Sequence, residues 1–311
     1  MGREAGFLFP GQGSQHAGMG RDVYDAWPQA RAVFDEVSRT AGFDLRAACF
    51  EESGRPLEST AVAQPALLAV ELSCAEVLTR AGVEPAAVAG HSLGEFAAWS
   101  ICGAMDRGQV AALVAQRGRL MAEAAHERPG SMAAILGLDP QEVTELCQRA
   151  SRAGVVTPAN FNCPGKVVIS GEMAAVQLAV QLAGERGAKG RMLPVAGGFH
   201  SPLMARAAER FAPALGEVNA LDPGVPVAAN ATGDWVRSVA AVKAAAAAQM
   251  TSPVLWENCV RKLLGAGIRR FYEVGPGNVL AGLVRQIDAS AEVIAAGDAE
   301  ALKQIVATSR G

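Results

Sequence analysis

Val88-Ala-Gly-His-Ser-Leu-Gly-Glu-Phe96 is a short apolar run that ends in a glycine-flanked serine and continues into residues that favour a helix. A Gly-x-Ser-x-Gly turn between a strand and a helix is typical of a nucleophile elbow. Small flanking residues let the backbone turn tightly, so the serine Oγ points into a cleft and the helix N-terminus faces any oxyanion that forms. Ser92 is therefore a candidate nucleophile. A plain strand-to-helix turn is the alternative interpretation of the same residues.

A second glycine-rich turn follows the apolar run at the N-terminus, in Phe7-Leu-Phe-Pro-Gly-Gln-Gly-Ser-Gln-His16. The spacing Gly11-x-Gly13 begins a dinucleotide-binding fingerprint, but His16 occupies the position of its third glycine. No acidic residue closes a convincing strand about twenty residues later, as that fingerprint requires. We therefore expect this turn to direct backbone N–H groups at an oxyanion beside Ser92.

The serine needs a base, and the chain contains the histidines His16, His91, His126 and His200. His91 directly precedes the serine and should point elsewhere, His126 lies in a polar segment, and the loop of His16 already has the oxyanion role. His200 precedes Ser201-Pro202, which has the pattern of a helix start. A lone loop histidine is more often structural than catalytic, but the elbow serine makes His200 the first choice.

A third catalytic acid is not evident. Between Ser92 and His200, the aspartates are Asp106, which is close to the elbow in sequence, and Asp139, which has the pattern of a helix N-cap. We therefore expect a Ser–His dyad in which a backbone carbonyl or an amide side chain orients the imidazole.

Six motifs occur in order along nearly the whole chain. They are Gly11-Gln-Gly-Ser-Gln15, Gly90-His-Ser-Leu-Gly-Glu95, Gln116-Arg-Gly118, Asn160-Phe-Asn-Cys-Pro-Gly165, Gly198-Phe-His-Ser-Pro202 and Glu273-Val-Gly-Pro-Gly277. Together they resemble the malonyl-CoA:acyl carrier protein transacylases. The resemblance implies that Ser92 is acylated by the malonyl group with His200 as its base. It assigns the oxyanion hole to the backbone N–H groups of Gln12 and Leu93.

The same resemblance implies which residues hold the substrate. Arg117 would pair with the free malonyl carboxylate, although a helical arginine is more often simply exposed. Gln249 would support the histidine, and Asn160 would lie near the site, although its amide could simply tie its loop together. Phe199 would face the acyl pocket, where an aromatic side chain accompanies malonyl rather than methylmalonyl. The implied substrates are malonyl-CoA and an acyl carrier protein.

The composition of the chain agrees with this resemblance but decides little by itself. The chain has 311 residues, of which 50% are hydrophobic and 19% charged, enough for a large core. No long apolar run or leader sequence is present, so we expect neither a membrane span nor export. The six cysteines are scattered and indicate reduced cytosolic thiols rather than disulfides or a zinc site. The net charge of −3 argues against nucleic-acid binding, and no metal or redox cofactor is expected.

The pattern of elements predicts an insertion at residues 129–196. The expected elements are a strand at 132–136, a helix at 140–152, strands at 155–160 and 166–170, a helix at 172–186 and a strand at 191–195. This βαββαβ order is typical of a ferredoxin-like subdomain. Residues 1–128 and 197–311 would form an α/β hydrolase-like main domain with a mostly parallel sheet. The expected elements there are strands at 7–9, 86–90, 225–229, 270–274 and 292–295, and a long helix from about 64 to 82.

The cleft between the two units is the natural binding site. There Ser92 would accept malonyl from coenzyme A and pass it to the pantetheine thiol of a carrier protein, by ping-pong kinetics. One alternative is a serine hydrolase that cleaves acyl thioesters with water and does not need Arg117. Another is a scaffold without activity that binds carrier protein. Fatty-acid and polyketide synthesis would use the same site.

Overall fold

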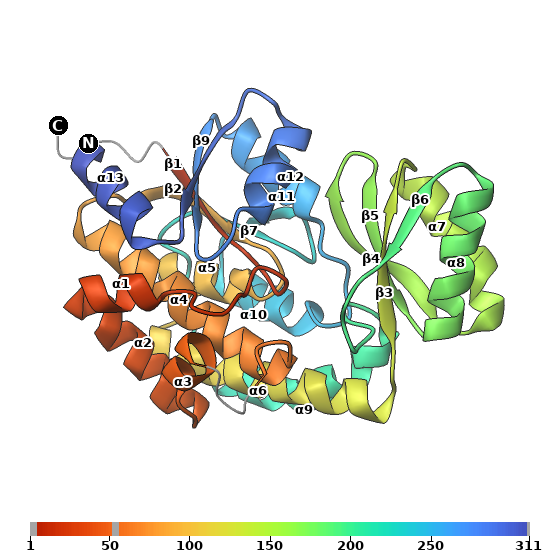
Figure 1. Cartoon of the computed structure of the whole chain (residues 1–311), viewed down its shortest axis with the longest axis horizontal. Coiled ribbons are helices and arrows are strands. Elements are labelled where there is room, and N and C mark those ends of the chain that lie inside the picture. The colour runs from red at the N-terminus through yellow and green to blue at the C-terminus, as the bar shows by residue number, and fades with distance from the viewer. Residues whose placement is uncertain (1–4, 52–55, 310–311) are drawn as a thin grey trace.

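The computed structural model describes residues 5–51 and 56–309, which form an α/β architecture with two sheets (Figure 1). The strands of the larger sheet are β1 (Ala5–Phe9), β2 (Pro85–Gly90), β7 (Val227–Ala229), β8 (Asp234–Val236), β9 (Arg270–Val274) and β10 (Glu292–Ala296). Their order is β10-β9-β1-β2-β7-β8, and every neighbouring pair is parallel except β7–β8. The predicted α/β class is confirmed. The short antiparallel strand β8, which the sequence analysis did not predict, makes the sheet mixed.

Helices cover both faces of this sheet. They are α1 (Arg21–Ala26), α2 (Pro28–Ala41), α3 (Leu45–Phe50), α4 (Thr60–Arg80), α5 (Gly94–Ile101), α6 (Arg107–Glu127), the 3₁₀ helix η2 (Pro202–Met204), α9 (Ala205–Glu217), α10 (Val239–Ala248), α11 (Trp256–Gly265), α12 (Val279–Ile287) and α13 (Ala299–Ser309). Because side chains alternate along a strand, Phe7 and Phe9 of β1 belong to the core with α4 and α5, whereas Leu8 packs with α11 and α12. The sheet is therefore the middle of three layers.

Helix α4 lies in the centre of one of these layers. Its length and composition would suffice to cross a membrane, but 89% of its most apolar window is buried within the fold. The helix packs beside α2 and α6 as a core element, and its predicted range of about 64–82 begins four residues late. Buried apolar area of this kind is the dominant stabilising contribution in a domain.

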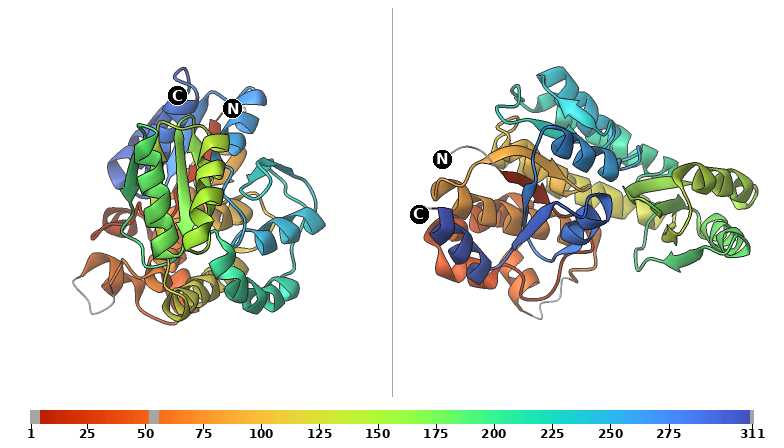
Figure 2. Two further views of the ribbon diagram at one scale, coloured as in Figure 1. Left: turned by 90° about the vertical axis from the view of Figure 1, so that its right-hand side faces the viewer. Right: turned by 90° about the horizontal axis from the view of Figure 1, so that it is seen from above.

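The smaller sheet and its helices form a two-layer unit beside the main part, which consists of the larger sheet and its helices (Figures 1 and 2). Its elements are β3 (Ser131–Leu136), α7 (Pro140–Ala150), the 3₁₀ helix η1 (Ser151–Ala153), β4 (Val156–Cys163), β5 (Lys166–Gly171), α8 (Met173–Glu185) and β6 (Lys189–Met192). The strand order is β4-β5-β3-β6, and all pairs are antiparallel. On β3, Ala133 and Ile135 pack against α7 and α8, which leaves Met132 and Ala134 facing the main part.

The last strand of this sheet differs from the expectation. The sequence analysis predicted it at 191–195, but β6 spans Lys189–Met192. The N–H of Leu193 still donates to Met132 O at 2.9 Å, and then Pro194, which has no N–H, ends the pairing. Residues 193–195 thus lie beyond the end of β6, and they line the main cavity.

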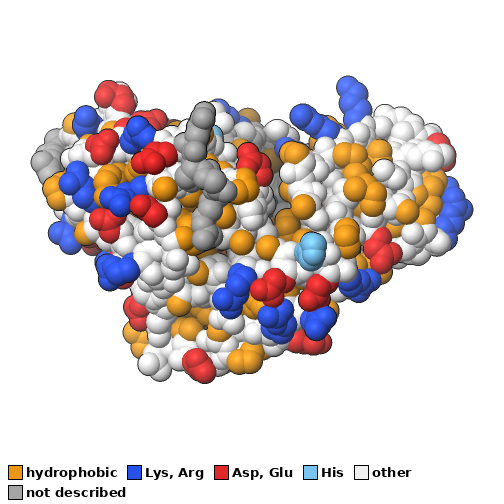
Figure 3. Space-filling model, turned by 60° about the horizontal axis from the view of Figure 1, so that its bottom comes forward, with side chains coloured by type: hydrophobic (Ala, Val, Ile, Leu, Met, Phe, Trp, Pro, Cys, Tyr) orange, Lys and Arg blue, Asp and Glu red, His pale blue; other side chains and the backbone are white. Residues whose placement is uncertain are grey.

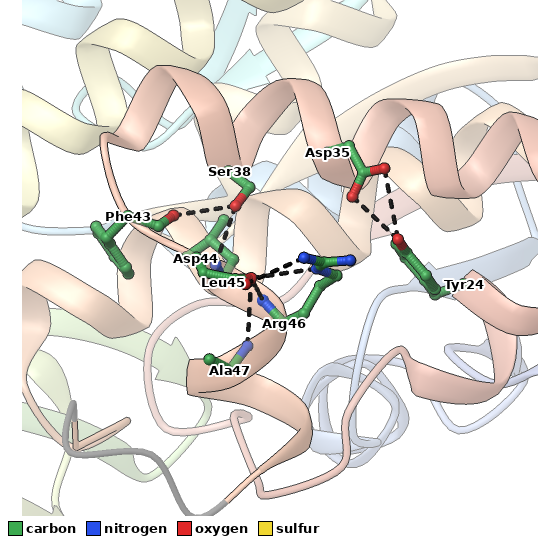
Figure 4. A network of polar contacts seen from close by, with 8 residues as sticks. All are labelled: Tyr24, Asp35, Ser38, Phe43, Asp44, Leu45, Arg46 and Ala47. Atoms are coloured by element: carbon green, nitrogen blue, oxygen red, sulfur yellow. Dashed lines mark hydrogen bonds and ion pairs between the residues drawn. The ribbon is translucent and has the colours of Figure 1, made fainter.

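The N-terminal helices are tied together by a polar network (Figure 4). Asp44 caps α3 by accepting from the N–H groups of Arg46 at 2.9 Å and Ala47 at 3.3 Å. The Ser38 hydroxyl donates to Phe43 O and accepts from Leu45 N–H, both at 3.0 Å. These contacts fix the turn between α2 and α3, which does not border the main cavity.

Charges of both signs are interspersed on the face formed by α6 and α9 (Figure 3). Arg206 pairs with Glu127 at 2.9 Å, and Arg210 pairs with Glu123 at 2.6 Å. Exposed pairs of this kind add little to stability. Because the two signs alternate, this face has no strong positive or negative electrostatic potential. The small net charge of the whole chain, −3, is in line with this.

Candidate active site

The sheet order brings two turns to one edge. Because β1 and β2 are parallel neighbours, the Gly11–Gly13 loop and the Ser92 turn follow them at the same end of the sheet. A Cβ on Gly90 would overlap the backbone of Gly94, so the elbow requires glycine there. Among the non-glycine residues that the structure describes, Ser92 and His200 have left-handed backbones, with φ of 51° and 56°. Strain of this kind is concentrated at functional sites.

Ser92 and His200 form a hydrogen-bonded pair. Ser92 Oγ lies 2.7 Å from His200 Nε2, and His200 Nδ1 lies 2.9 Å from Gln249 O and 3.2 Å from Ser252 O. Because both partners of Nδ1 are carbonyl oxygens, Nδ1 carries the hydrogen, and Nε2 is free to accept the Ser92 proton. Burial, together with the Arg117 charge, lowers the pKa of His200 to about 3. The imidazole is therefore neutral at pH 7, as a general base must be.

The elbow is clamped by two residues that sequence reasoning missed. Asn230, at the end of β7, accepts from Ser92 N–H and donates to Gly90 O, both at 2.7 Å. Glu95 accepts from Asn230 N–H at 2.7 Å and from Gln249 Nε2 at 2.5 Å. Burial raises the pKa of Glu95 to about 7. Both side chains are fully buried. Asn230 bonds to the backbone of the turn directly, and Glu95 bonds to the backbone of Asn230.

Arg117 is buried in the cavity rather than exposed, with a relative accessibility of 1%. Its Nη1 donates to Gln64 Oε1 at 2.6 Å, and its Nη2 donates to Gln249 Oε1 at 2.8 Å and to Ser92 Oγ at 3.3 Å. Within the described chain, no carboxylate lies at salt-bridge distance from the guanidinium. Burial lowers the pKa of Arg117 to about 10, which still leaves it charged at pH 7. An unpaired buried cation is a ready partner for an anionic ligand.

A cavity of about 510 Å³ lies between the two sheets and contains this chemistry. Gln12 and Leu93 line it, and among the described residues no group accepts a hydrogen bond from either backbone N–H. Phe199 also lines the cavity, and Asn160 Oδ1 is buried there without a partner in the described part of the chain. The cavity therefore offers hydrogen-bond donors beside the serine and a buried amide oxygen in its otherwise mostly apolar lining.

The other histidines and aspartates considered from the sequence do not hydrogen-bond to the Ser92 hydroxyl. His16 and His126 are exposed, whereas His91 lines the cavity and its Nε2 contacts Asn162 Oδ1 at 2.9 Å. Asp106 and Asp139 cap α6 and α7 with full capping boxes, so neither can act as a third catalytic acid. The structure thus brings together the expected serine, histidine, arginine, glutamines and phenylalanine, and it leaves the other titratable candidates at structural positions.

Glu273 precedes the Gly-Pro-Gly turn and has a structural contact of its own. Its buried carboxylate accepts from the N–H groups of Leu280 at 2.9 Å and Ala281 at 2.8 Å. These groups lie at the start of α12, where an anion is favourable. The last of the six motifs therefore holds the N-terminus of a helix whose residues Val279, Leu280 and Leu283 line the cavity.

The chain is similar to known acyl transferases over almost its whole length. A family model described as the acyl transferase domain matches residues 6–305. A malonyl CoA-acyl carrier protein transacylase of Bacillus subtilis is 40% identical over 305 residues, which cover 97% of this chain and 96% of the relative. The solved malonyl CoA-acyl carrier protein transacylase of Coxiella burnetii superimposes with a TM-score of 0.94 at 34% identity, covering 98% of this chain and 97% of that one. A malonyl-transacylase solved with a type II polyketide synthase acyl-carrier protein also has a TM-score of 0.94, at 36% identity, covering 98% and 99% of the two chains.

Proposed function

The chain belongs to the malonyl-CoA:acyl carrier protein transacylases of the acyl transferase family, and on this premise we propose the reaction that its site performs. It transfers a malonyl group from coenzyme A to the pantetheine thiol of an acyl carrier protein. The intermediate is an ester on Ser92. Since the acyl group is bound covalently to the enzyme after it leaves the coenzyme A thiol and before it reaches the pantetheine thiol, the kinetics are ping-pong.

The first half-reaction loads the serine. Ser92 Oγ attacks the thioester carbonyl while His200 Nε2, at 2.7 Å, takes the hydroxyl proton. The N–H groups of Gln12 and Leu93 stabilise the tetrahedral oxyanion. The C–S bond then breaks, and the coenzyme A thiolate leaves with the proton from His200. The carbonyl oxygens of Gln249 and Ser252 hold the imidazolium meanwhile.

The second half-reaction runs the same path in reverse. The pantetheine thiol gives its proton to His200 Nε2, and its sulfur attacks the ester carbonyl on Ser92. When the tetrahedral intermediate collapses, the C–Oγ bond breaks and the serine recovers its proton from the imidazolium. The dyad is thereby returned to its starting state, and each step uses the same pair of oxyanion donors.

The observation that carries the proposal is the buried, carboxylate-free guanidinium of Arg117, 3.3 Å from the nucleophile. The free carboxylate of malonyl would supply the missing anion through two parallel hydrogen bonds. This contact would also position the substrate, because a malonyl group whose carboxylate is bound to Arg117 places its thioester carbonyl beside Ser92 Oγ. A hydrolase for neutral acyl thioesters would have no use for a buried cation at this position.

The experiment that tests the proposal is incubation with radiolabelled malonyl-CoA, with and without a carrier protein. Label on the carrier establishes transfer. Release of free malonate at the same rate with and without carrier would favour the thioester hydrolase instead. Retention of all label on coenzyme A would contradict both enzymatic functions and leave only a binding scaffold.

The proposal includes the wider setting of the enzyme. We propose a hydrolase-like main domain of residues 1–128 and 197–311 and a ferredoxin-like subdomain of residues 129–196; residues 1–4, 52–55 and 310–311 of these ranges lie outside the described part. The βαββαβ connectivity and the order β4-β5-β3-β6 support the second assignment. The mechanism calls for no metal or redox cofactor, and we expect a cytoplasmic enzyme that works on carrier protein.

A further inference from the structure

Two polar side chains of α4 connect Arg117 to the oxyanion loop. Gln64 Oε1 accepts from Arg117 Nη1 at 2.6 Å, and Gln64 Nε2 donates to Thr60 Oγ1 at 2.8 Å. The Thr60 hydroxyl donates to Gln12 Oε1 at 2.7 Å. The connection therefore runs from the guanidinium to the residue whose backbone N–H faces the oxyanion.

The order of donors along this connection is fixed. Arginine can only donate, so the Gln64 oxygen must face Arg117 and its NH₂ group must face Thr60. Thr60 Oγ1 accepts that hydrogen bond and gives its own proton to Gln12. Successive bonds that point the same way polarise one another, and a charged first donor strengthens the whole series.

The close packing of α4 against α6 makes the hydrogen bond between Gln64 and Arg117 possible. A Cβ on Gly118, the residue after Arg117, would lie 2.9 Å from Thr60 O and 3.5 Å from Gln64 Cβ. Only glycine lets the two helices approach this closely without a shift. Thr60 and Gln64 are 5% and 1% exposed, so each polar group would be costly to bury without the partner it has here.

We propose that Gln64 and Thr60 are positioning residues with two separable effects, an inference that rests on the transacylase function proposed above. Gln64 fixes the plane of the Arg117 guanidinium and so sets the preference for an acyl group that carries a carboxylate. Thr60 fixes the side chain of Gln12 and so sets the oxyanion donor, which every acyl group needs. Neither residue touches the reacting atoms.

The first test replaces Gln64. In Gln64→Met the volume is kept and the acceptor is lost, so kcat/KM for malonyl-CoA should fall about 10- to 100-fold, while that for acetyl-CoA should fall less than about threefold. Gln64→Glu places a carboxylate against Arg117 that competes with malonyl, and its ratio of malonyl to acetyl loading should be lower still. Gln148→Met, an exposed helical glutamine, is the matched control and should leave both rates unchanged.

The second test replaces Thr60. Thr60→Val removes the hydroxyl at constant shape and should lower malonyl and acetyl loading by the same factor, about 10-fold, because both need the oxyanion donor. Thr60→Ser restores the hydroxyl and should recover most of that loss. Loading is followed as the adduct on Ser92 by rapid-quench intact-protein mass spectrometry, with a thermal melt of each variant.

The outcomes separate this inference from the function on which it rests. If the unaltered protein forms no malonyl-serine, the proposed function fails. If it does, equal losses for both thioesters in Gln64→Met and Gln64→Glu would overturn the role of Gln64. A loss confined to malonyl in Thr60→Val, or no recovery in a folded Thr60→Ser, would overturn the role of Thr60.

Discussion

Replacing Arg117 by alanine removes the buried cation that, in the function we propose, binds the malonyl carboxylate. The guanidinium is 1% exposed and donates to neutral amide oxygens of Gln64 and Gln249. A charged pair that forms in such a site, and whose partner stays buried and unpaired after truncation, is worth about 2 to 5 kcal/mol. That free energy corresponds to a loss of about 30-fold to several thousand-fold in kcat/KM for malonyl-CoA.

Acetyl-CoA provides the contrast, because its methyl group has no charge to pair. Acetyl loading of Arg117→Ala should stay at its original rate or increase. The matched control is Arg119→Ala, two positions along α6, where the arginine is exposed and lies 3.8 Å from Glu123. That variant should transfer malonyl and acetyl at the rates of the unaltered protein. Stopped-time assays of both thioesters with one carrier protein measure all four rates.

The same variant should also change the pH dependence of acetyl loading. Burial is the main cause that lowers the pKa of His200 to about 3, and the Arg117 charge adds to it. Without that charge the pKa of His200 rises toward its ordinary value, so the base becomes protonated at a higher pH. The acid limb of acetyl loading should therefore move to higher pH. Equal losses for malonyl and acetyl, with an unmoved acid limb, would refute carboxylate recognition by Arg117.

Four further predictions concern single residues. Ser92→Ala should give no malonyl adduct in intact-protein mass spectrometry, and an adduct of equal yield would contradict its role as nucleophile. His200→Ala should lower transfer by about 10³-fold or more, whereas His16→Ala should be mild; the reverse result would identify a different base. Asn230→Ala should lower the melting temperature, because the buried Gly90 O loses its partner at about 1 to 3 kcal/mol and the part-buried Ser92 N–H loses its partner as well. An unchanged melt would contradict the clamp. With Phe199 in place, kcat/KM should be higher for malonyl-CoA than for methylmalonyl-CoA, and the opposite preference would count against steric selection.

The parts of the site that sequence reasoning located have local signatures. The elbow is confined to five consecutive residues, and the helix start at Ser201-Pro202 identifies the loop that carries His200. The expectation that an amide side chain or a carbonyl orients the imidazole followed from the two aspartates between Ser92 and His200, neither of which fitted a third catalytic acid. In the structure Nδ1 lies 2.9 Å from Gln249 O, and the two aspartates in that interval are helix caps.

The parts that it missed depend on which strands are neighbours. Asn230 lies 138 residues after Ser92 and reaches it because β7 pairs with β2, an order that hydrophobic periodicity does not reveal. The antiparallel strand β8 is three residues long, too short for an alternating pattern to stand out. The last strand of the insertion was predicted at 191–195, but β6 ends at Met192. Pro194 could have indicated this earlier end, because proline has no N–H for strand pairing.

Amide side chains, rather than carboxylates, accept the hydrogen bonds that Arg117 donates to its neighbours Gln64 and Gln249. A carboxylate at position 64 or 249 would neutralise the guanidinium and compete with the malonyl group for the same hydrogen bonds. An amide oxygen orients the guanidinium without cancelling its charge, and the amide NH₂ group continues the network, to Thr60 on one side and to Glu95 on the other. The carboxyl group of Glu95 is thus kept one side chain away from the guanidinium, joined to it through Gln249. In the function we propose, the selectivity of the site for an anionic acyl group therefore depends on the neutral residues that surround the cation as well as on the cation itself.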